Sequence, residues 1–129
     1  MKQLRTVITI LTIVFILLAG SLVSYRYVET TTQHMGVLLE SVENSITDQK
    51  WEQAQNVLNN AQQKWKNDNS KWGIILDHEV IDNINFNLKQ LEKSIGLQDV
   101  SESISEVTTL KLQFEHIFDN ELFTMKNIF

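Results

Sequence analysis

The apolar residues of the chain form two patterns, one unbroken run near the N-terminus and a series of regularly spaced positions after it. The run covers Thr6–Tyr25, 20 uncharged residues between Arg5 and Arg26. At about 1.5 Å per residue, a helix of this length crosses the ~30 Å hydrocarbon core of a membrane. We therefore expect a transmembrane helix. A cleavable signal peptide is the alternative, because Ala19 and Ser21 have the spacing that a signal peptidase accepts, but the run is longer than a typical signal peptide requires.

Beyond the run, apolar residues recur every three or four positions, which is the spacing of helices with one buried face. No Pro interrupts the first stretch, so we predict one long helix from about Leu4 to Ile46. Thr47 and Asp48 should end it, with Asp48 as the N-cap of a second helix that carries Trp51 to Trp65 on its buried face.

Two further turns are expected. Asn67–Ser70 has the composition of a turn, and a third helix should follow it, with Ile74 and Trp72 near its start. Gly96 should end that helix, with Leu97 making the apolar contact of a Schellman C-cap. Asp99–Glu102 then resembles a capping box that opens a fourth helix.

Short connections between amphipathic helices favour antiparallel neighbours. We expect an all-α protein in which an N-terminal transmembrane helix continues into an antiparallel up-down-up-down four-helix bundle. Residues 1–26 would form a cytoplasmic stub and transmembrane anchor, and residues 27–129 an extracytoplasmic bundle, in which no internal repeat is apparent. The expected core consists of Trp51, Ala54, Leu58, Trp65, Ile81, Ile84, Leu88, Leu91 and Phe114.

Composition and charge narrow the choice of function. The 129 residues include no Cys, which excludes disulfides and thiolate metal sites, and only four Gly, which argues against a glycine-rich nucleotide loop. After Arg26 there are 16 acidic and eight basic residues, a formal charge of −8, so no nucleic-acid partner is expected. Lys2 and Arg5 precede the span and place the N-terminus in the cytoplasm by the positive-inside rule.

Few residues suggest chemistry. His78, Glu79 and Asp82, with His116 on the last helix, are the candidates for a metal site. Such a site needs three or four ligands, and the Glu-x-x-His pairs of di-iron bundles are absent. We therefore expect His78 to be structural, at the edge of the core and hydrogen-bonded to Asp82 or a backbone carbonyl. We expect no cofactor and no enzymatic activity, since no Ser lies in a glycine elbow.

The C-terminal segment is more apolar than a soluble tail requires. A fourth helix that runs back toward the membrane would bring this segment to the bilayer surface. It would then either contact lipid or a partner's membrane helix, or close the base of the bundle. The residues concerned are Phe123, Met125, Asn127, Ile128 and Phe129.

Several of these residues together resemble the bacterial Domain of Unknown Function 4363 family. The resemblance rests on Trp51-Glu52-Gln53-Ala54 through Trp65, on His78 to Ile84 with Leu88 and Leu91, and on the closing Asn127-Ile128-Phe129. It covers most of the chain and implies a small single-span membrane protein of Gram-positive bacteria with a multi-span membrane protein as partner. It implies no activity, but it strengthens His78, Glu79, Asp82 and Asn127 as site candidates.

Three functions follow from these observations. The first is a membrane-anchored extracytoplasmic bundle that acts as an interaction or accessory subunit of another membrane protein, without catalysis. The second is a ligand-sensing four-helix ectodomain, although chemoreceptors of that kind normally have a second span and a cytoplasmic output domain. The third is a metal-binding bundle that uses His78, Asp82 and His116.

Overall fold

The computed structural model describes the backbone of residues 2–128, and the side chains of this range other than those of residues 24, 25, 28, 69, 70, 72–75, 118 and 120–128. Within residues 2–128 the protein has four helices and no strand. The helices are α1 (Lys2–Thr47), α2 (Trp51–Ile75), α3 (His78–Gly96) and α4 (Val100–Ile128). The all-α prediction is confirmed, and so is the prediction of a single long first helix. The absence of Pro from the sequence permits a helix of this length.

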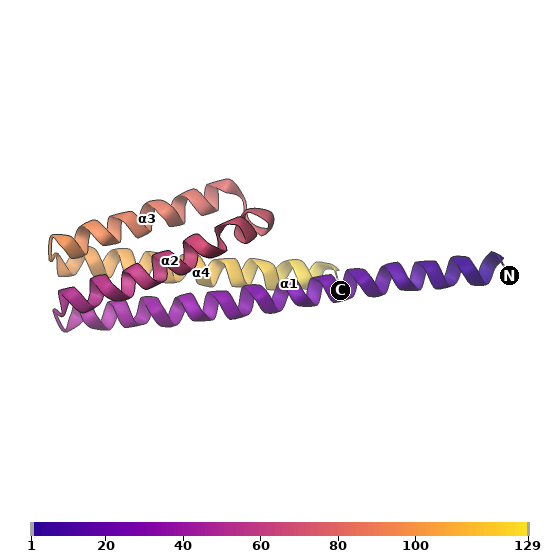
Figure 1. The fold of residues 1–129 in the computed structure, drawn as a ribbon, viewed down its shortest axis with the longest axis horizontal. Coiled ribbons are helices and arrows are strands. Elements are labelled where there is room, and N and C mark those ends of the chain that lie inside the picture. Colours follow the sequence, from indigo (N-terminus) through magenta and orange to yellow (C-terminus); the bar gives the residue numbers. More distant parts are fainter. Residues whose placement is uncertain (1, 129) are drawn as a thin grey trace.

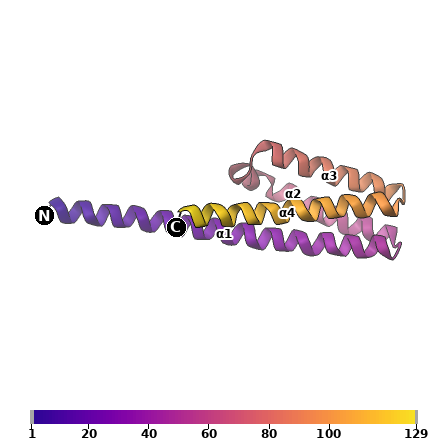
Figure 2. The ribbon, with the colours of Figure 1, turned by 180° about the vertical axis from the view of Figure 1, so that it is seen from behind.

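The helices pack into a bundle. α1 contacts α2 and α4, and α3 contacts the same two helices. α1 and α3 therefore lie diagonally opposite each other. Figures 1 and 2 show the four helices side by side, while the N-terminal part of α1 extends alone beyond the bundle.

The core follows the predicted apolar stripes. Trp51 is the exception among the expected core residues: its side chain is half-buried and packs on the edge of the core, because α2 begins at this residue and has no earlier turn to cover it. The expected core residues that the structure buries are Ala54, Leu58, Trp65, Ile81, Ile84, Leu88, Leu91 and Phe114.

The turn between α1 and α2 is a Schellman motif. The N–H of Lys50 donates to the carbonyl of Ser45 at 2.8 Å, and the N–H of Gln49 donates to the carbonyl of Ile46 at 2.9 Å. Gln49 has a φ of 56°, the left-handed conformation that this motif requires. The expected N-cap role of Asp48 was wrong, because this residue belongs to the capped end of α1 and α2 begins only at Trp51.

The turn between α3 and α4 has the same design. The N–H of Asp99 donates to the carbonyl of Ser94 at 3.1 Å, and Gln98 has a φ of 55°. The predicted end of the third helix at Gly96 is confirmed, since Gly96 is the last residue of α3. The left-handed position is taken by Gln98, two residues later. Leu97 is consequently 70% exposed instead of covering the cap.

Asp99 also begins α4, as expected. Its Oδ1 accepts a hydrogen bond from the N–H of Glu102 at 3.0 Å, which satisfies one of the free donors in the first turn of the helix. The predicted capping role of Asp99 is confirmed.

The predicted turn at Asn67–Ser70 was wrong, because these residues lie inside α2. Asn, Asp and Ser each cost only about 0.7 kcal/mol or less in a helix, and the segment contains neither Pro nor Gly. Lys64 and Asp68 are one helical turn apart, and their Nζ and Oδ2 atoms lie 3.7 Å from each other. This ion pair supports the helix across the segment. Trp72 and Ile74 therefore belong to the end of α2, and their side chains lie outside the described residues.

The bundle contains a structural repeat that the sequence does not reveal. Every buried residue from Met35 to Trp65 is matched by a buried residue 49 positions later, in the stretch from Ile84 to Phe114. The left-handed Gln49 and Gln98 have the same separation. The α1–α2 and α3–α4 hairpins are thus equivalent halves. The expectation of no repeat failed because the correspondence lies mainly in the buried positions and the turn, while most of the exposed residues between them differ.

Candidate functional site

The N-terminal half of α1 has the properties of a membrane span. Lys2–Val23 is long and apolar enough to cross a membrane, and none of it is buried against the rest of the protein. The hydroxyls of Thr6, Thr9 and Thr12 donate to the carbonyls four residues earlier, at 2.8–3.0 Å. These hydroxyls are therefore satisfied within the helix, as a hydrocarbon environment requires.

The C-terminal end of α4 lies beside this exposed stretch. In Figures 1 and 2 the C end of the chain meets α1 where α1 leaves the bundle, and no other helix lies beside α1 from there to the N end. Residues 123–128 belong to α4. The side chains predicted as an interface lie outside the described residues, namely those of Phe123, Met125, Asn127, Ile128 and Phe129.

Close to the same end of the bundle, α2 packs on α1 through Lys71, whose Nζ lies 5.6 Å from the centroid of the Tyr27 ring. This is within the range of a cation–π contact. Burial raises the pKa of Tyr27 above its ordinary value, and the negative charge of Asp68 raises it further. The phenol therefore stays protonated at any physiological pH.

A charged contact joins α4 to α1. Lys111 Nζ donates to Glu43 Oε2 at 2.9 Å, and both side chains are about one-third exposed. This hydrogen bond raises the pKa of Lys111 above its ordinary value, against the lowering effect of burial, and the charge of Glu40 adds to it. The pair contributes modestly to stability, because partial exposure screens it.

The structure does not bring the candidate metal ligands together. His78 is the first residue of α3, and Glu79 and Asp82 follow it with exposed side chains. The prediction that His78 lies at the edge of the core was wrong: at the beginning of the helix it is exposed, and the buried stripe starts at Ile81. Among the described residues, no group of three His, Cys, Asp or Glu side chains could hold a metal ion.

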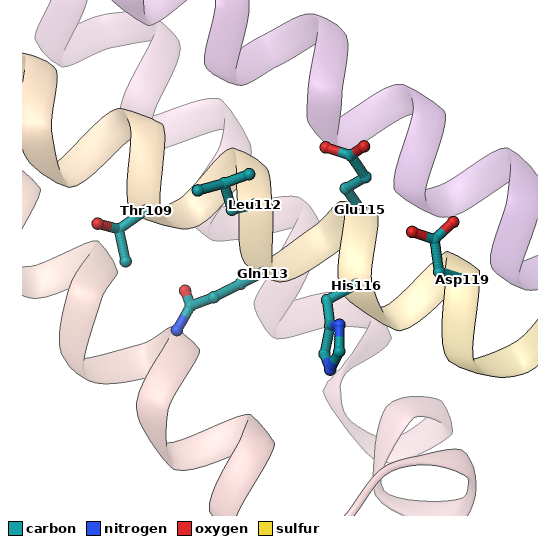
Figure 3. A pocket seen from close by; sticks show the side chains of 6 residues that line it. All are labelled: Thr109, Leu112, Gln113, Glu115, His116 and Asp119. Carbon is teal, nitrogen blue, oxygen red and sulfur yellow. The ribbon is translucent and has the colours of Figure 1, made fainter.

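His116 lies in an open cleft of about 500 Å³ on the surface of α4. Figure 3 shows Glu115 and Asp119 pointing toward α1, whereas Gln113 and His116 point to the other side of α4. Because the imidazole and the two carboxylates diverge, they do not form a joint acid–base or metal-binding group. The residues that line the cleft are Thr109, Leu112, Gln113, Glu115, His116 and Asp119.

A second cleft lies between α2 and α3, and sequence reasoning did not identify it. It is lined by Gln62, Trp65, Lys66, Asn85, Leu88 and Lys89. Trp65, expected as a core residue, donates its indole N–H to Asn85 Oδ1 at 2.6 Å. No local motif signals this site, since the two halves of its lining are about 20 positions apart in the chain and meet only when the helices pack.

Comparison with known proteins identifies the family. The model of a domain of unknown function, DUF4363, matches residues 22–128, and the chain belongs to this family. The matched region begins near the end of the apolar stretch and includes the whole bundle. No curated protein and no solved structure matches the chain.

Proposed function

We propose that this protein is a membrane-anchored accessory subunit, without catalytic activity, whose bundle lies outside the cytoplasmic membrane and binds a multi-span membrane protein. One observation carries the proposal: the C-terminal end of α4 lies beside α1 where α1 leaves the bundle (Figure 1). A single span would then present two adjacent helices at the membrane surface, one entering the bilayer and one ending there.

The chain order that this arrangement requires is an antiparallel up-down-up-down bundle. Contacts between neighbouring helices support it. Lys71 of α2 lies over Tyr27 of α1, far from the α1–α2 turn on both helices, and Lys111 of α4 pairs with Glu43 near the far end of α1. An even number of helices returns the chain to the end from which it started.

The composition of the last residues supports an interface at the membrane. Four of the last seven residues are large and apolar, and Lys126 is the only charged one among them. An apolar segment with one flexible cation suits the boundary between lipid and headgroups, where the ammonium reaches water while the stem stays in apolar surroundings. The orientation follows the positive charges of Lys2 and Arg5, which favour a cytoplasmic N-terminus.

The experiment is site-specific photocrosslinking of the full chain in native membranes. A photoreactive residue in place of Asn127 should yield an adduct with an integral membrane protein that only detergent extracts. The matched control carries the same group in place of Glu92, on the exposed face of α3. Deletion of Lys126–Phe129 should also remove the partner from a pulldown. If position 127 yields no more adduct than position 92, the C-terminal end of α4 is not the interface.

A further inference from the structure

The cleft between α2 and α3 has the dimensions of a small-molecule site. Its volume is about 340 Å³, and most ligand pockets lie between roughly 300 and 1,000 Å³. Leu88 and Trp65, each 3% exposed, provide its apolar floor. The remaining lining residues are the polar Gln62, Lys66, Asn85 and Lys89.

One hydrogen bond orients a donor at this site. The indole N–H of Trp65 donates to Asn85 Oδ1 at 2.6 Å, so the amide oxygen of Asn85 is directed at the indole. The amide NH₂ group, on the opposite side of the same planar group, is left to donate elsewhere. Gln62 Nε2 donates to Glu92 Oε2 at 3.4 Å, and Glu92 is not among the residues that line the cleft.

The charge of the cleft is opposite to that of the protein. Both charged residues in its lining are lysines, and neither Lys66 nor Lys89 forms an ion pair with a residue that the structure describes. Lys64 and Lys111, by contrast, each pair with a carboxylate. The two ammonium groups of the cleft are therefore not neutralised by any carboxylate that the structure describes, although acidic residues outnumber basic ones in the chain.

We propose that the cleft between α2 and α3 binds a small organic anion that carries a carboxylate or a phosphate. The ammonium groups of Lys66 and Lys89 would contact the charge, and the Asn85 amide would donate to one of its oxygens. Leu88 and the edge of Trp65 would cover the apolar part of the ligand. Charge-assisted hydrogen bonds of this kind are the strongest that side chains offer to such groups. The site is independent of the membrane partner proposed above.

The test is a titration of the full chain in detergent micelles, followed through the indole N–H resonance of Trp65. The probes are inorganic phosphate, acetate and benzoate, each compared with chloride at equal ionic strength. We expect a saturable shift with at least one of the three. Saturation with phosphate alone assigns a phosphate ligand, and tighter binding of benzoate than of acetate assigns an apolar carboxylate.

The variant K66Q/K89Q should weaken this binding by about tenfold or more, the equivalent of one lost strong contact. K64Q/K93Q is the matched control, because it removes one lysine from each of the same two helices outside the cleft lining, and it should leave the affinity within about twofold. Two results would overturn the proposal. One is the absence of saturation with all three probes, and the other is an equal loss of affinity in both double variants, which would indicate only general charge attraction.

Discussion

Trp65 and Phe114 meet edge to face, with ring centroids 5.4 Å apart and an interplanar angle of 82°. The two residues occupy equivalent positions in the two helical hairpins, 49 residues apart. The contact therefore joins the hairpins at matching points. Aromatic pairs in this geometry contribute about 0.5–1.5 kcal/mol beyond the burial of their surface.

Replacement of Trp65 by Ala should lower the free energy of unfolding by about 3–5 kcal/mol, since it leaves a cavity and removes the contact with Phe114. Trp51 provides the control: it is half-buried, so Trp51→Ala should cost less than about 2 kcal/mol. Chemical denaturation of the full chain in micelles, followed by far-ultraviolet circular dichroism, measures both. Equal losses would show that Trp65 is no more important to the core than a residue at its edge.

Ser103 should be replaceable by Ala with a gain in stability. Its side chain is fully buried, and in the described part of the chain its Oγ has no hydrogen-bond partner. The equivalent residue in the first hairpin is Ala54, also fully buried. Because a buried unsatisfied hydroxyl costs about 1–3 kcal/mol, Ser103→Ala should stabilise the bundle by about 1 kcal/mol, and Ala54→Ser should destabilise it by a similar amount.

Ser94→Ala is the control for that experiment. Ser94 is also buried, but its Oγ donates to the carbonyl of Gln90 at 2.9 Å. Its replacement should bring no gain. If Ser94→Ala and Ser103→Ala stabilise the protein equally, burial of the hydroxyl alone is the cause, and the missing partner of Ser103 has no specific effect.

Glu106 should make stability depend on pH. Burial raises its pKa above the ordinary value of 4.5, and the negative charge of Glu102 one turn earlier raises it further. The folded state thus holds the proton more tightly than the unfolded state. The free energy of unfolding must then fall as the pH rises through the interval above 4.5 in which the folded carboxyl ionises.

Glu106→Gln removes this ionisation and should stabilise the protein by about 0.5 kcal/mol at neutral pH, the usual cost of a like-charge pair one turn apart. The gain should vanish below about pH 4, where the carboxyl is protonated in both states. Glu115→Gln removes the same charge from an exposed position of α4 and is the control. Thermal melts at several pH values would contradict the prediction if the gain were independent of pH.

The sequence predicts the helices well, because the spacing of residues such as Leu39 and Leu88 reports directly on a buried helical face. It predicts their ends less well. Gln49 and Gln98 adopt a left-handed conformation that Gly usually takes, and the hydrogen bonds of the Schellman motif offset the cost. The segment Asn67–Ser70 is polar both as a turn and as the exposed part of a long helix, so its composition alone does not distinguish the two.

The clefts were beyond prediction for a different reason. Whether His78 and His116 meet depends on the register of α3 and α4, and whether Lys66 lies near Lys89 depends on how α2 and α3 pack. Neither is a property of local spacing. Trp65 illustrates the point: its burial follows from its position on the stripe, but its hydrogen bond to Asn85 depends on the alignment of two helices.

The proposed topology makes the last prediction, and the absence of Cys from the chain makes it simple to test. A single Cys at position 37 or 97 replaces an exposed apolar residue of the bundle, Val37 at 67% or Leu97 at 70% exposure. A single Cys in place of Gln3 lies at the other end of the span. In intact bacterial cells, a maleimide that cannot cross membranes should label positions 37 and 97 at once, and position 3 only after the membrane is permeabilised.

The labelled protein should keep its full mass of 15.0 kDa plus the label, since the span is retained. Labelling of position 3 in intact cells would reverse the orientation. Loss of the first 20 or so residues from the labelled protein would instead show that the apolar helix is a cleaved signal peptide, whose usual length this is.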